Sequence, residues 1–571
     1  MHTAKLRPLD KWLLAFTFLT LSASSIAWTL IDKTPPAWDP ADHMIAGYDY
    51  YYPLANLDFA AFKEEFFGAS HSYAPLVHLI TAVVFLLFGA SRVTGIVVNL
   101  ISLAVLLLSV SWIARTLYSN PADSQSPDTK QGSAALSVLA PLLATSYHFS
   151  AWLLHDAFLD YPLIAIVSLS FAMLIRADNF QIRRHALMFG LTAGLGMLTK
   201  QTFAFFMLLP ALYVTAKVLI AFDRKAILNL ALAGLVAVAV AAVWYGPHLT
   251  DVIEIYRINR QAAINENEAP LFTFRSNLYY PHALLSTQMQ LPLGLIFLAG
   301  LIYSLARRSR ESVLLYLWLV GGIGAFILVA NKDPRYTVPV LPAAALISVS
   351  WLASSFVNHD NGRSWLKNRL SVVKPVAVTC IAVWALVSFY DAQWPRPGMG
   401  YYIDTPDFRW MVFARNYFTL DHRPGPETWA VPDIVGSVLA DYQARGEGAL
   451  AISSLDPVAA GQSIPTVGVV VNLPYLNPSS IALYARLMTH KRGAPPLFKV
   501  DWVAVESAQD RIQHCDFIVV RTGLDRAEWV APMERYVEEL IRTNPGRFNR
   551  VRSFPIPLEG AEAVLYRTTG G

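Results

Sequence analysis

Carboxylates stand close to proline at two places where a long apolar run meets a polar loop. Asp39 directly precedes a proline, and Asp156 and Asp160 lie four residues apart just before another. A fixed carboxylate can take the proton of an incoming hydroxyl group and so make it a better nucleophile. The same residues suit helix N-caps. The local sequence supports both interpretations of Asp39 equally, whereas capping explains the pair of acids less well. His43, one helical turn after Asp39, leaves a divalent metal possible.

Basic residues recur in the other polar segments, next to aromatic or apolar residues. Such cations form charge-assisted hydrogen bonds with phosphate, and their apolar surroundings suit a phosphate that is attached to a lipid. A lysine at the end of a membrane span can also simply extend its charge to the interface. Together with the carboxylates, however, these cations predict transfer of a group from a lipid phosphate at the membrane surface. The candidate phosphate-binding residues are Lys200, Arg257, Arg260, Arg275, Lys332, Arg335 and Tyr336.

The composition requires a membrane around these residues. The chain has 571 residues, of which 54% are hydrophobic and 15% are charged, whereas about a quarter is charged in a soluble protein. The composition excludes disorder, a coiled coil and a disulfide framework, and a net charge of +4 is too small to predict a nucleic-acid partner. Charged residues cluster between apolar runs up to about Gln393 and are evenly spread after it. We therefore predict a polytopic α-helical membrane domain over 1–392 and a soluble domain over 393–571.

Eleven apolar segments are long enough to cross a bilayer, which takes about 17–25 residues, if flanking residues extend the two shorter ones, 162–175 and 186–199. They lie near 12–31, 93–114, 134–154, 162–175, 186–199, 203–222, 226–246, 284–305, 312–330, 337–356 and 375–391.

A further apolar run, 75–89, decides the topology. If it does not cross the membrane, 18 of the 27 basic residues of 1–392 fall on one side, which the positive-inside rule makes the cytoplasm. We therefore expect eleven spans, a cytoplasmic N-terminus, and 75–89 as a juxtamembrane helix after an outer loop, 32–74. All the candidate acids and phosphate-binding cations, and the soluble domain, then lie on the extracytoplasmic face of what we expect to be the cell inner membrane.

The soluble domain alternates β-rich runs with helical patterns. Apolar runs at 467–472, 500–505, 517–520 and 563–566 are separated by amphipathic segments near 433–445, 478–490 and 530–543. That order is typical of an α/β domain with a partly parallel sheet. No glycine-rich phosphate loop or cluster of metal ligands occurs there, so we expect a cap or an acceptor-guiding module.

Two other functions fit a protein of this composition. A transporter or flippase of a lipid-linked sugar would carry charges or Gly/Pro breaks within its spans, often in repeated halves. Here nearly all ionisable residues lie at the ends of the spans and no internal repeat is found. A receptor without catalytic activity would use the acids only as caps. The enzyme is the leading hypothesis.

Four short motifs make the membrane domain similar to a known family. It resembles the GT-C glycosyltransferases, and within them the protein O-mannosyltransferase and aminoarabinose transferase superfamily. The resemblance covers about 1–392. Its motifs are Trp38-Asp39-Pro40, Leu159-Asp160-Tyr161-Pro162-Leu163, the glycine-rich stretch from Gly190 to Lys200, and the stretch from Lys332 to Pro342.

The resemblance implies a polyprenyl-phosphate sugar donor, inversion at the sugar carbon and a base in the first outer loop. By this likeness Asp39 is the base, Asp160 is the second acid, and Lys200, Arg257, Arg260 and Arg335 bind phosphate. The chain departs from the family where many members have Asp-Glu, because here Asp39 precedes Pro40. Many members also carry a Lys-Pro or His-Pro-Pro step before the juxtamembrane helix, and here only His71 stands nearby. The acceptor, whether protein, lipid or glycan, is not implied, and metal dependence varies in the superfamily.

Overall fold

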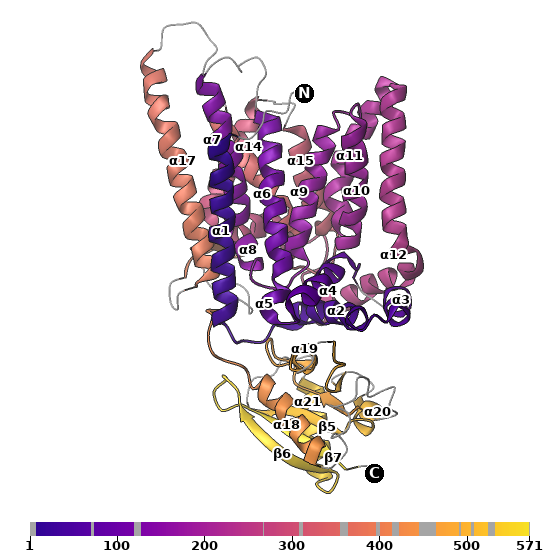
Figure 1. The fold of residues 1–571 in the computed structure, drawn as a ribbon. Coiled ribbons are helices and arrows are strands. Elements are labelled where there is room, and N and C mark those ends of the chain that lie inside the picture. Colours follow the sequence, from indigo (N-terminus) through magenta and orange to yellow (C-terminus); the bar gives the residue numbers. More distant parts are fainter. Residues whose placement is uncertain are drawn as a thin grey trace.

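The computed structural model consists of a tall helical bundle with a smaller α/β domain beneath one end (Figure 1). The first helix begins at the opposite end of the bundle from the α/β domain. The structure describes residues 7–69, 73–118, 127–266, 268–307, 312–353, 364–395, 400–413, 422–444, 464–489, 493–503, 508–523 and 531–569.

Sixteen helical elements of the described chain form the bundle and its lower rim. They are α1 (Pro8–Ile31), α5 (Arg92–Gly95), α6 (Val97–Tyr118), α7 (Pro127–Ser146), α8 (His148–Leu153), α9 (Asp160–Arg176), α10 (Arg183–Thr199), α11 (Phe203–Ala221), α12 (Arg224–Asn265), α13 (Phe274–Ala283), the π-helix η1 (Leu284–Gln288), α14 (Leu291–Arg307), α15 (Val313–Ile327), the 3₁₀-helix η2 (Pro334–Val340), α16 (Leu341–Ala353) and α17 (Ser364–Gln393).

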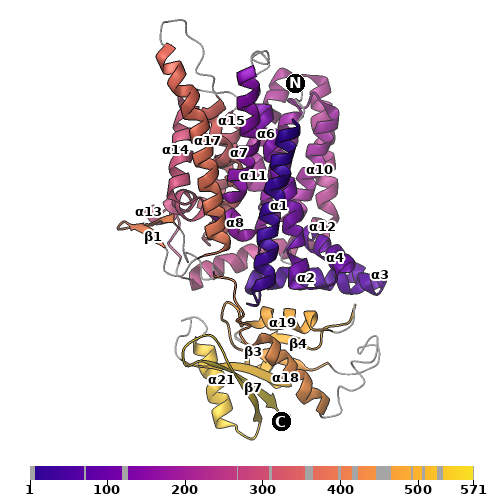
Figure 2. The same cartoon turned by 60° about the vertical axis from the view of Figure 1, so that its left-hand side comes forward.

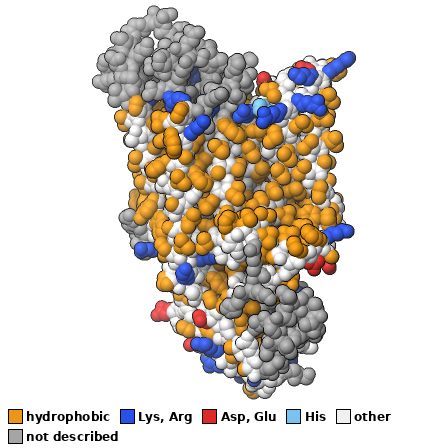
Figure 3. All heavy atoms as spheres, in the orientation of Figure 1, with side chains coloured by type: hydrophobic (Ala, Val, Ile, Leu, Met, Phe, Trp, Pro, Cys, Tyr) orange, Lys and Arg blue, Asp and Glu red, His pale blue; other side chains and the backbone are white. Residues whose placement is uncertain are grey.

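The bundle is built to sit in a bilayer. Among the described residues, six helices are long and apolar enough to cross a membrane, and a seventh is obtained if the bent pair Phe274–Gln288 and Leu291–Arg307 is one span. Figure 3 shows a continuous belt of hydrophobic side chains around the bundle, with Lys and Arg at both rims. The chain is therefore a polytopic integral membrane protein, and the described residues of each predicted segment are largely helical.

Small residues allow neighbouring helices of the bundle to approach closely. Gly190 and Gly194, four residues apart on α10, face the backbone and side chains of α12, where a Cβ atom would collide with Ala233 and Val240. This is the small-residue packing that membrane helices favour, because lipid supplies no hydrophobic force between them. The glycine-rich motif therefore allows α10 to pack closely against α12. This packing positions the end of α10, at Lys200.

Three short helices form a layer across the lower end of the bundle, as Figures 1 and 2 show. They are α2 (Trp38–Ala55), α3 (Phe59–Phe67) and α4 (Leu76–Phe88). The N-cap of α2 is Ala37, so Asp39 lies in the first turn of the helix rather than at its cap. Capping does not account for Asp39, and its charge instead favours the positive end of the helix dipole.

Several helices of the bundle are broken near the same lower end. In α12, Pro247 is followed by a non-helical His248 (φ −105°, ψ 16°), because proline cannot donate the helical hydrogen bond. The helical tract of α13 and η1 (Phe274–Gln288) and the following α14 are bent by 119° relative to each other. Gln290, at that junction, has a positive φ of 64°, which is strained for a residue with a side chain.

The C-terminal domain is a three-layer α/β structure. Its strands are β3 (Thr466–Val469), β4 (Lys499–Trp502), β5 (Phe517–Thr522), β6 (Phe548–Pro555) and β7 (Glu562–Thr568), and its helices are α18 (Val431–Ala444), α19 (Pro478–Leu487), α20 (Ala508–Gln513) and α21 (Ala531–Thr543). The sheet order is β4-β3-β5-β7-β6, parallel across β4, β3 and β5 and antiparallel beyond. One apolar core joins α18 and α19 to the sheet and another joins α20 and α21. The mixed sheet agrees with the alternating sequence pattern, which missed β6.

A hairpin of β1 (Tyr401–Asp404) and β2 (Arg409–Phe413) connects the two parts. It lies against η1, where the backbone N–H of Met411 donates to the hydroxyl of Ser286 at 2.7 Å.

The α/β domain is fastened directly to the layer that carries Asp39. The side chain of Arg486 in α19 pairs with Asp49 of α2 at 2.9 Å, and the indole N–H of Trp38 donates to Asn472 at 2.6 Å. The N–H of Gly493 donates to the hydroxyl of Tyr51 at 3.0 Å. Contacts therefore run along α2 from its first residue to its last turns, and α2 lies between the bundle and the domain.

Candidate active site

Asp39 and Arg335 meet although they are 296 residues apart in the sequence. The Nη1 atom of Arg335 donates to Oδ2 of Asp39 at 2.9 Å. The same guanidinium contacts Oδ2 of Asp333 through Nε at 2.7 Å and Nη2 at 2.6 Å. It also lies over the ring of Phe158 at 4.6 Å. Two carboxylates and an aromatic face therefore hold this arginine at one position.

The turn at the start of η2 explains why Arg335 points to Asp39. Asp333 caps η2 by accepting the backbone N–H of Arg335 at 2.8 Å, and Pro334 fixes the first residue of the helix. Proline is preorganised for that position because its φ is already helical. The carboxylate that caps the turn thus also orients the guanidinium.

A second ion pair joins α10 to α9. The Nζ atom of Lys200, the C-cap of α10, lies 2.8 Å from Oδ1 of Asp160, in the first turn of α9. Asp160 is 3% exposed, so this charge depends on its partner. The ammonium group also lies 5.8 Å from the centre of the Tyr336 ring. We refer to Asp39, Asp160, Lys200, Asp333 and Arg335 as the Asp39 site.

The charges of this site act on one another. Burial raises the pKa of the Asp39 carboxyl. Arg335, and then His43 and Lys200, lower this pKa by more than burial raises it, so it lies below its ordinary value of 3.8. Asp39 is therefore ionised at neutral pH and able to accept a proton. Its side chain is 42% exposed, against 14% for Arg335, so a substrate hydroxyl can reach the carboxylate while the cation lies deeper.

His43 and Tyr73 form the wall of the site on the side of α4. Burial lowers the pKa of His43 to about 4, so its imidazole is neutral at neutral pH. Its Nδ1 lies 3.3 Å from Nε2 of His78, and its ring is 5.0 Å from that of Tyr73. Burial and the nearby charge of Asp39 raise the pKa of Tyr73, which keeps this hydroxyl protonated.

The structure is similar to solved structures of a membrane protein. The structure is similar to that of ArnT from Cupriavidus metallidurans bound to undecaprenyl phosphate, with a TM-score of 0.54 and 14% identity over 98% of this chain and 99% of that one. Against ArnT in the apo state the TM-score is 0.55, with 14% identity over 99% and 100% of the two chains. No protein-family model and no curated protein sequence matches.

The chain has the GT-C fold. The likeness extends over the α/β domain as well as the bundle, whereas the sequence motifs suggested it only for about 1–392. The fold implied by the sequence resemblance is thereby confirmed.

Other predicted residues of this GT-C chain lie away from the Asp39 site. Arg257 is 76% exposed and pairs with Glu254 at 3.0 Å, and Arg260 and Arg275 are also exposed. The kink after Pro247 turns this part of α12 across the lower end of the bundle (Figure 1). The structure therefore does not bring these three arginines to Asp39. His71 lies outside the described residues.

Lys332 and Asp156 are engaged elsewhere. Lys332 donates to the carbonyl groups of Phe326 and Ile327 at 3.0 and 2.9 Å, at the end of α15, and burial lowers its pKa to about 8. Burial also raises the pKa of Asp156, whose carboxylate accepts the N–H of Ala157 at 2.9 Å. Both side chains thus stabilise the turns in which they stand.

Asp156 belongs to a second polar cluster, at the joint with the α/β domain. There Asp32 pairs with Arg92 and lies 3.2 Å from Nε2 of His422. His422 in turn lies 3.0 Å from the hydroxyl of Tyr475. Sequence analysis missed this cluster because its members come from five distant segments.

Sequence analysis did not single out Asp333 of the Asp39 site, nor Phe158 and Tyr73, which lie beside that site. Asp333 carried a usable signal, since it stands before a proline as Asp39 does. Among the described residues, no group of three or more His, Cys, Asp or Glu side chains is placed to hold a metal ion.

Proposed function

We propose that this protein is an integral-membrane glycosyltransferase that moves a sugar from a polyprenyl-phosphate donor to a hydroxyl or amine group of an acceptor, with inversion. The observation that carries the proposal is the convergence of an accessible, ionised Asp39 with Arg335 and Lys200, two cations from distant turns. A base on one side and cations on the other are what transfer from a phosphate requires.

The donor phosphate is proposed to bind Arg335 and Lys200. The guanidinium matches the geometry of phosphate oxygens, and the aromatic rings of Phe158 and Tyr336 beside the two cations provide apolar surface for the lipid. The ArnT structure with the same fold holds undecaprenyl phosphate, which supports a donor of this class.

In the proposed reaction the acceptor oxygen or nitrogen attacks the anomeric carbon as the bond to the phosphate oxygen breaks. The proton of the acceptor passes to Asp39, and the electron pair of the broken bond leaves on the polyprenyl phosphate. Arg335 and Lys200 stabilise that added negative charge. One direct displacement inverts the configuration at the sugar carbon. Asp160 holds Lys200 in place.

Donor binding also strengthens the base. A phosphate that takes hydrogen bonds from Arg335 competes with Asp39 for the same cation. Because burial alone raises the pKa of Asp39 and Arg335 is the main opposing influence, weakening this ion pair raises the pKa. The carboxylate then becomes a better proton acceptor when a donor is present, which limits reaction in its absence.

The proposal includes the membrane topology predicted from the sequence. It comprises eleven spans, a cytoplasmic N-terminus in the cell inner membrane, 75–89 as a juxtamembrane helix, and a domain over 393–571 on the extracytoplasmic side. The acceptor, a protein, lipid or glycan, would reach Asp39 from that side.

Mass spectrometry of envelope glycans and lipids tests this function. A strain lacking the protein should lose one sugar substituent and accumulate the corresponding polyprenyl-phosphate sugar. Expression of the wild type should restore the substituent, whereas Asp39→Asn at equal abundance should not. Purified protein in proteoliposomes should then transfer that sugar. Movement of the lipid-linked sugar between leaflets without transfer would instead identify a flippase.

A further inference from the structure

A second polar centre lies at the C-terminal end of α17, apart from the Asp39 site. Asp391 stands in the last turn of α17, within a helix that can span the membrane, and is 5% exposed. Its carboxylate accepts from Nε2 of Gln290 at 2.9 Å and lies 3.9 Å from Nδ1 of His148. A buried carboxylate at the end of a membrane-spanning helix, where the helix dipole is negative, costs free energy.

Three places where a helix starts, bends or ends meet at this centre. His148 begins α8 directly after the interruption at Tyr147, Gln290 occupies the strained junction of η1 and α14, and Asp391 ends α17. Interrupted helices that meet around polar side chains are typical of binding sites in membrane proteins. The cost of strain and of a buried charge in one place suggests a use for them.

The amide of Gln290 has an unused acceptor. Its nitrogen must face the carboxylate of Asp391, because an ionised carboxylate can only accept. Its oxygen Oε1 then has no hydrogen-bond partner among the described residues, although Gln290 is 0% exposed.

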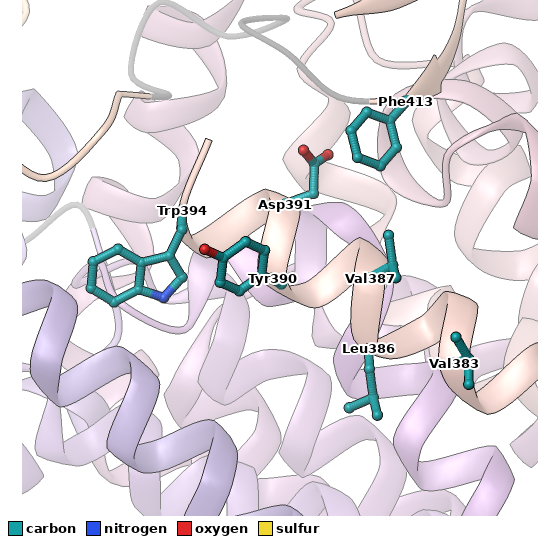
Figure 4. Close-up of a pocket in the computed structure, with 7 residues that line it drawn as sticks. All are labelled: Val383, Leu386, Val387, Tyr390, Asp391, Trp394 and Phe413. Atoms are coloured by element: carbon teal, nitrogen blue, oxygen red, sulfur yellow. The ribbon is translucent and has the colours of Figure 1, made fainter. Parts of the chain in front are cut away.

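An apolar pocket leads from the lipid-facing surface to Asp391, with a volume of about 450 Å³. Figure 4 shows Asp391 between Tyr390 and Phe413, with the Trp394 indole on the other side of Tyr390. Val383, Leu386 and Tyr390 are 54%, 46% and 51% exposed and share one face of α17, so the pocket opens towards the hydrocarbon region. The lining residues are Val383, Leu386, Val387, Tyr390, Asp391, Trp394 and Phe413.

We propose that this pocket binds a phospholipid with a primary ammonium headgroup, as in phosphatidylethanolamine. Its acyl chain would lie along the exposed apolar side chains of α17. Its ammonium N–H groups would donate to Asp391, the acidic residue among those that line the pocket. A carboxylate is an acceptor, so an anionic headgroup without a strong donor is disfavoured, and phosphatidylcholine carries no N–H to donate. The site is independent of the proposed transfer reaction.

Native mass spectrometry of the full-length protein from nanodiscs tests this site. The discs contain equal amounts of phosphatidylethanolamine, phosphatidylcholine and phosphatidylglycerol of the same chain length, and the lipids that remain bound are counted. The wild type should retain phosphatidylethanolamine about ten-fold over phosphatidylcholine, as expected for one charge-assisted hydrogen bond. Asp391→Asn should bring the two lipids close to parity, and Leu386→Trp, which fills the pocket from its lipid-facing side, should weaken retention of both.

Two control variants should retain the wild-type preference. Leu19→Trp alters a 63% exposed leucine on α1, and Glu254→Gln removes an exposed acid at the rim. Leu386→Trp alters a surface side chain and keeps the test informative if Asp391→Asn does not fold. Equal retention of the ethanolamine and choline lipids by the wild type, unchanged retention of both lipids in Leu386→Trp, or preferred retention of phosphatidylglycerol would each overturn the proposal.

Discussion

Replacement of Arg335 tests how the donor phosphate is held. Arg335→Gln should weaken the binding of undecaprenyl phosphate by roughly ten- to hundred-fold, because a hydrogen bond to a charged group contributes about 1.5–3 kcal/mol and each tenfold change in affinity corresponds to about 1.4 kcal/mol. Arg335→Lys should lose part of this affinity. Lysine keeps the charge, but its single ammonium group cannot replace a guanidinium that contacts Asp39 and Asp333 together.

The same change should lower the stability of the fold. Asp333 is 13% exposed, and removal of one partner from a buried ion pair typically costs about 3–5 kcal/mol. Loss of the ion pair with Asp39 should cost less stability, because the Asp39 side chain is 42% exposed and water solvates its carboxylate. The double variant Asp333→Asn, Arg335→Gln should therefore regain thermal stability without regaining affinity, which separates the two effects.

The assay is titration of the purified variants with undecaprenyl phosphate, with Arg257→Gln as the matched control. Arg257 was an equally strong candidate in the sequence, but in the structure it is exposed and paired with Glu254, so its replacement should leave the affinity unchanged. A folded Arg335→Gln variant with wild-type affinity, or an equal loss in Arg257→Gln, would refute the assignment of the phosphate site.

Three further outcomes are expected. Lys200→Gln should weaken undecaprenyl phosphate binding about ten-fold, and adding Asp160→Asn should restore the melting temperature but not the affinity; restoration of both would make Lys200 only a partner of Asp160. The pKa of Asp39 lies below 3.8 in the free protein, so kcat/KM should stay level as the pH falls to about 5. In Arg335→Gln the main influence that lowers this pKa is lost, so the acid limb of kcat/KM should move to higher pH. An unchanged limb would exclude Asp39 as the titrating base. In a variant without the native Cys380 and Cys515, an impermeant thiol reagent should label Asn544→Cys in intact cells but not Arg224→Cys, and the opposite pattern would reverse the topology.

The sequence was sufficient to select four residues that the structure brings together in the Asp39 site, but it left their pairing open. Asp39, Asp160, Lys200 and Arg335 could be selected because each lies in a polar segment near an apolar run, on the side that should be poor in basic residues. Whether Asp39 capped a helix or served chemistry was undecided, since both uses need the same residue at the same place. In the structure the N-cap is Ala37, which removes the capping interpretation, and Asp39 pairs with Arg335, while its role as a base stays a prediction.

Other features depend on how helices are oriented relative to one another, which no local sequence pattern predicts. Pro247 signals an interrupted helix, but not that the segment beyond it would place Arg257 on an exposed surface. Gln290 and Asp391 lie in or beside apolar runs and meet only because η1 and α14 meet at a sharp angle. The contact of Trp38 with Asn472 joins two domains that are separate in composition.

The most direct test of the account is the turnover of Asp39→Asn. Asparagine keeps the size of the side chain and can still accept a hydrogen bond from Arg335, but it cannot take a proton from the acceptor. Turnover of the native donor and acceptor, identified from the deletion strain, should fall by about a hundred-fold or more, with undecaprenyl phosphate binding retained. Near-normal transfer by a folded Asp39→Asn variant would contradict the assignment of Asp39 as the base.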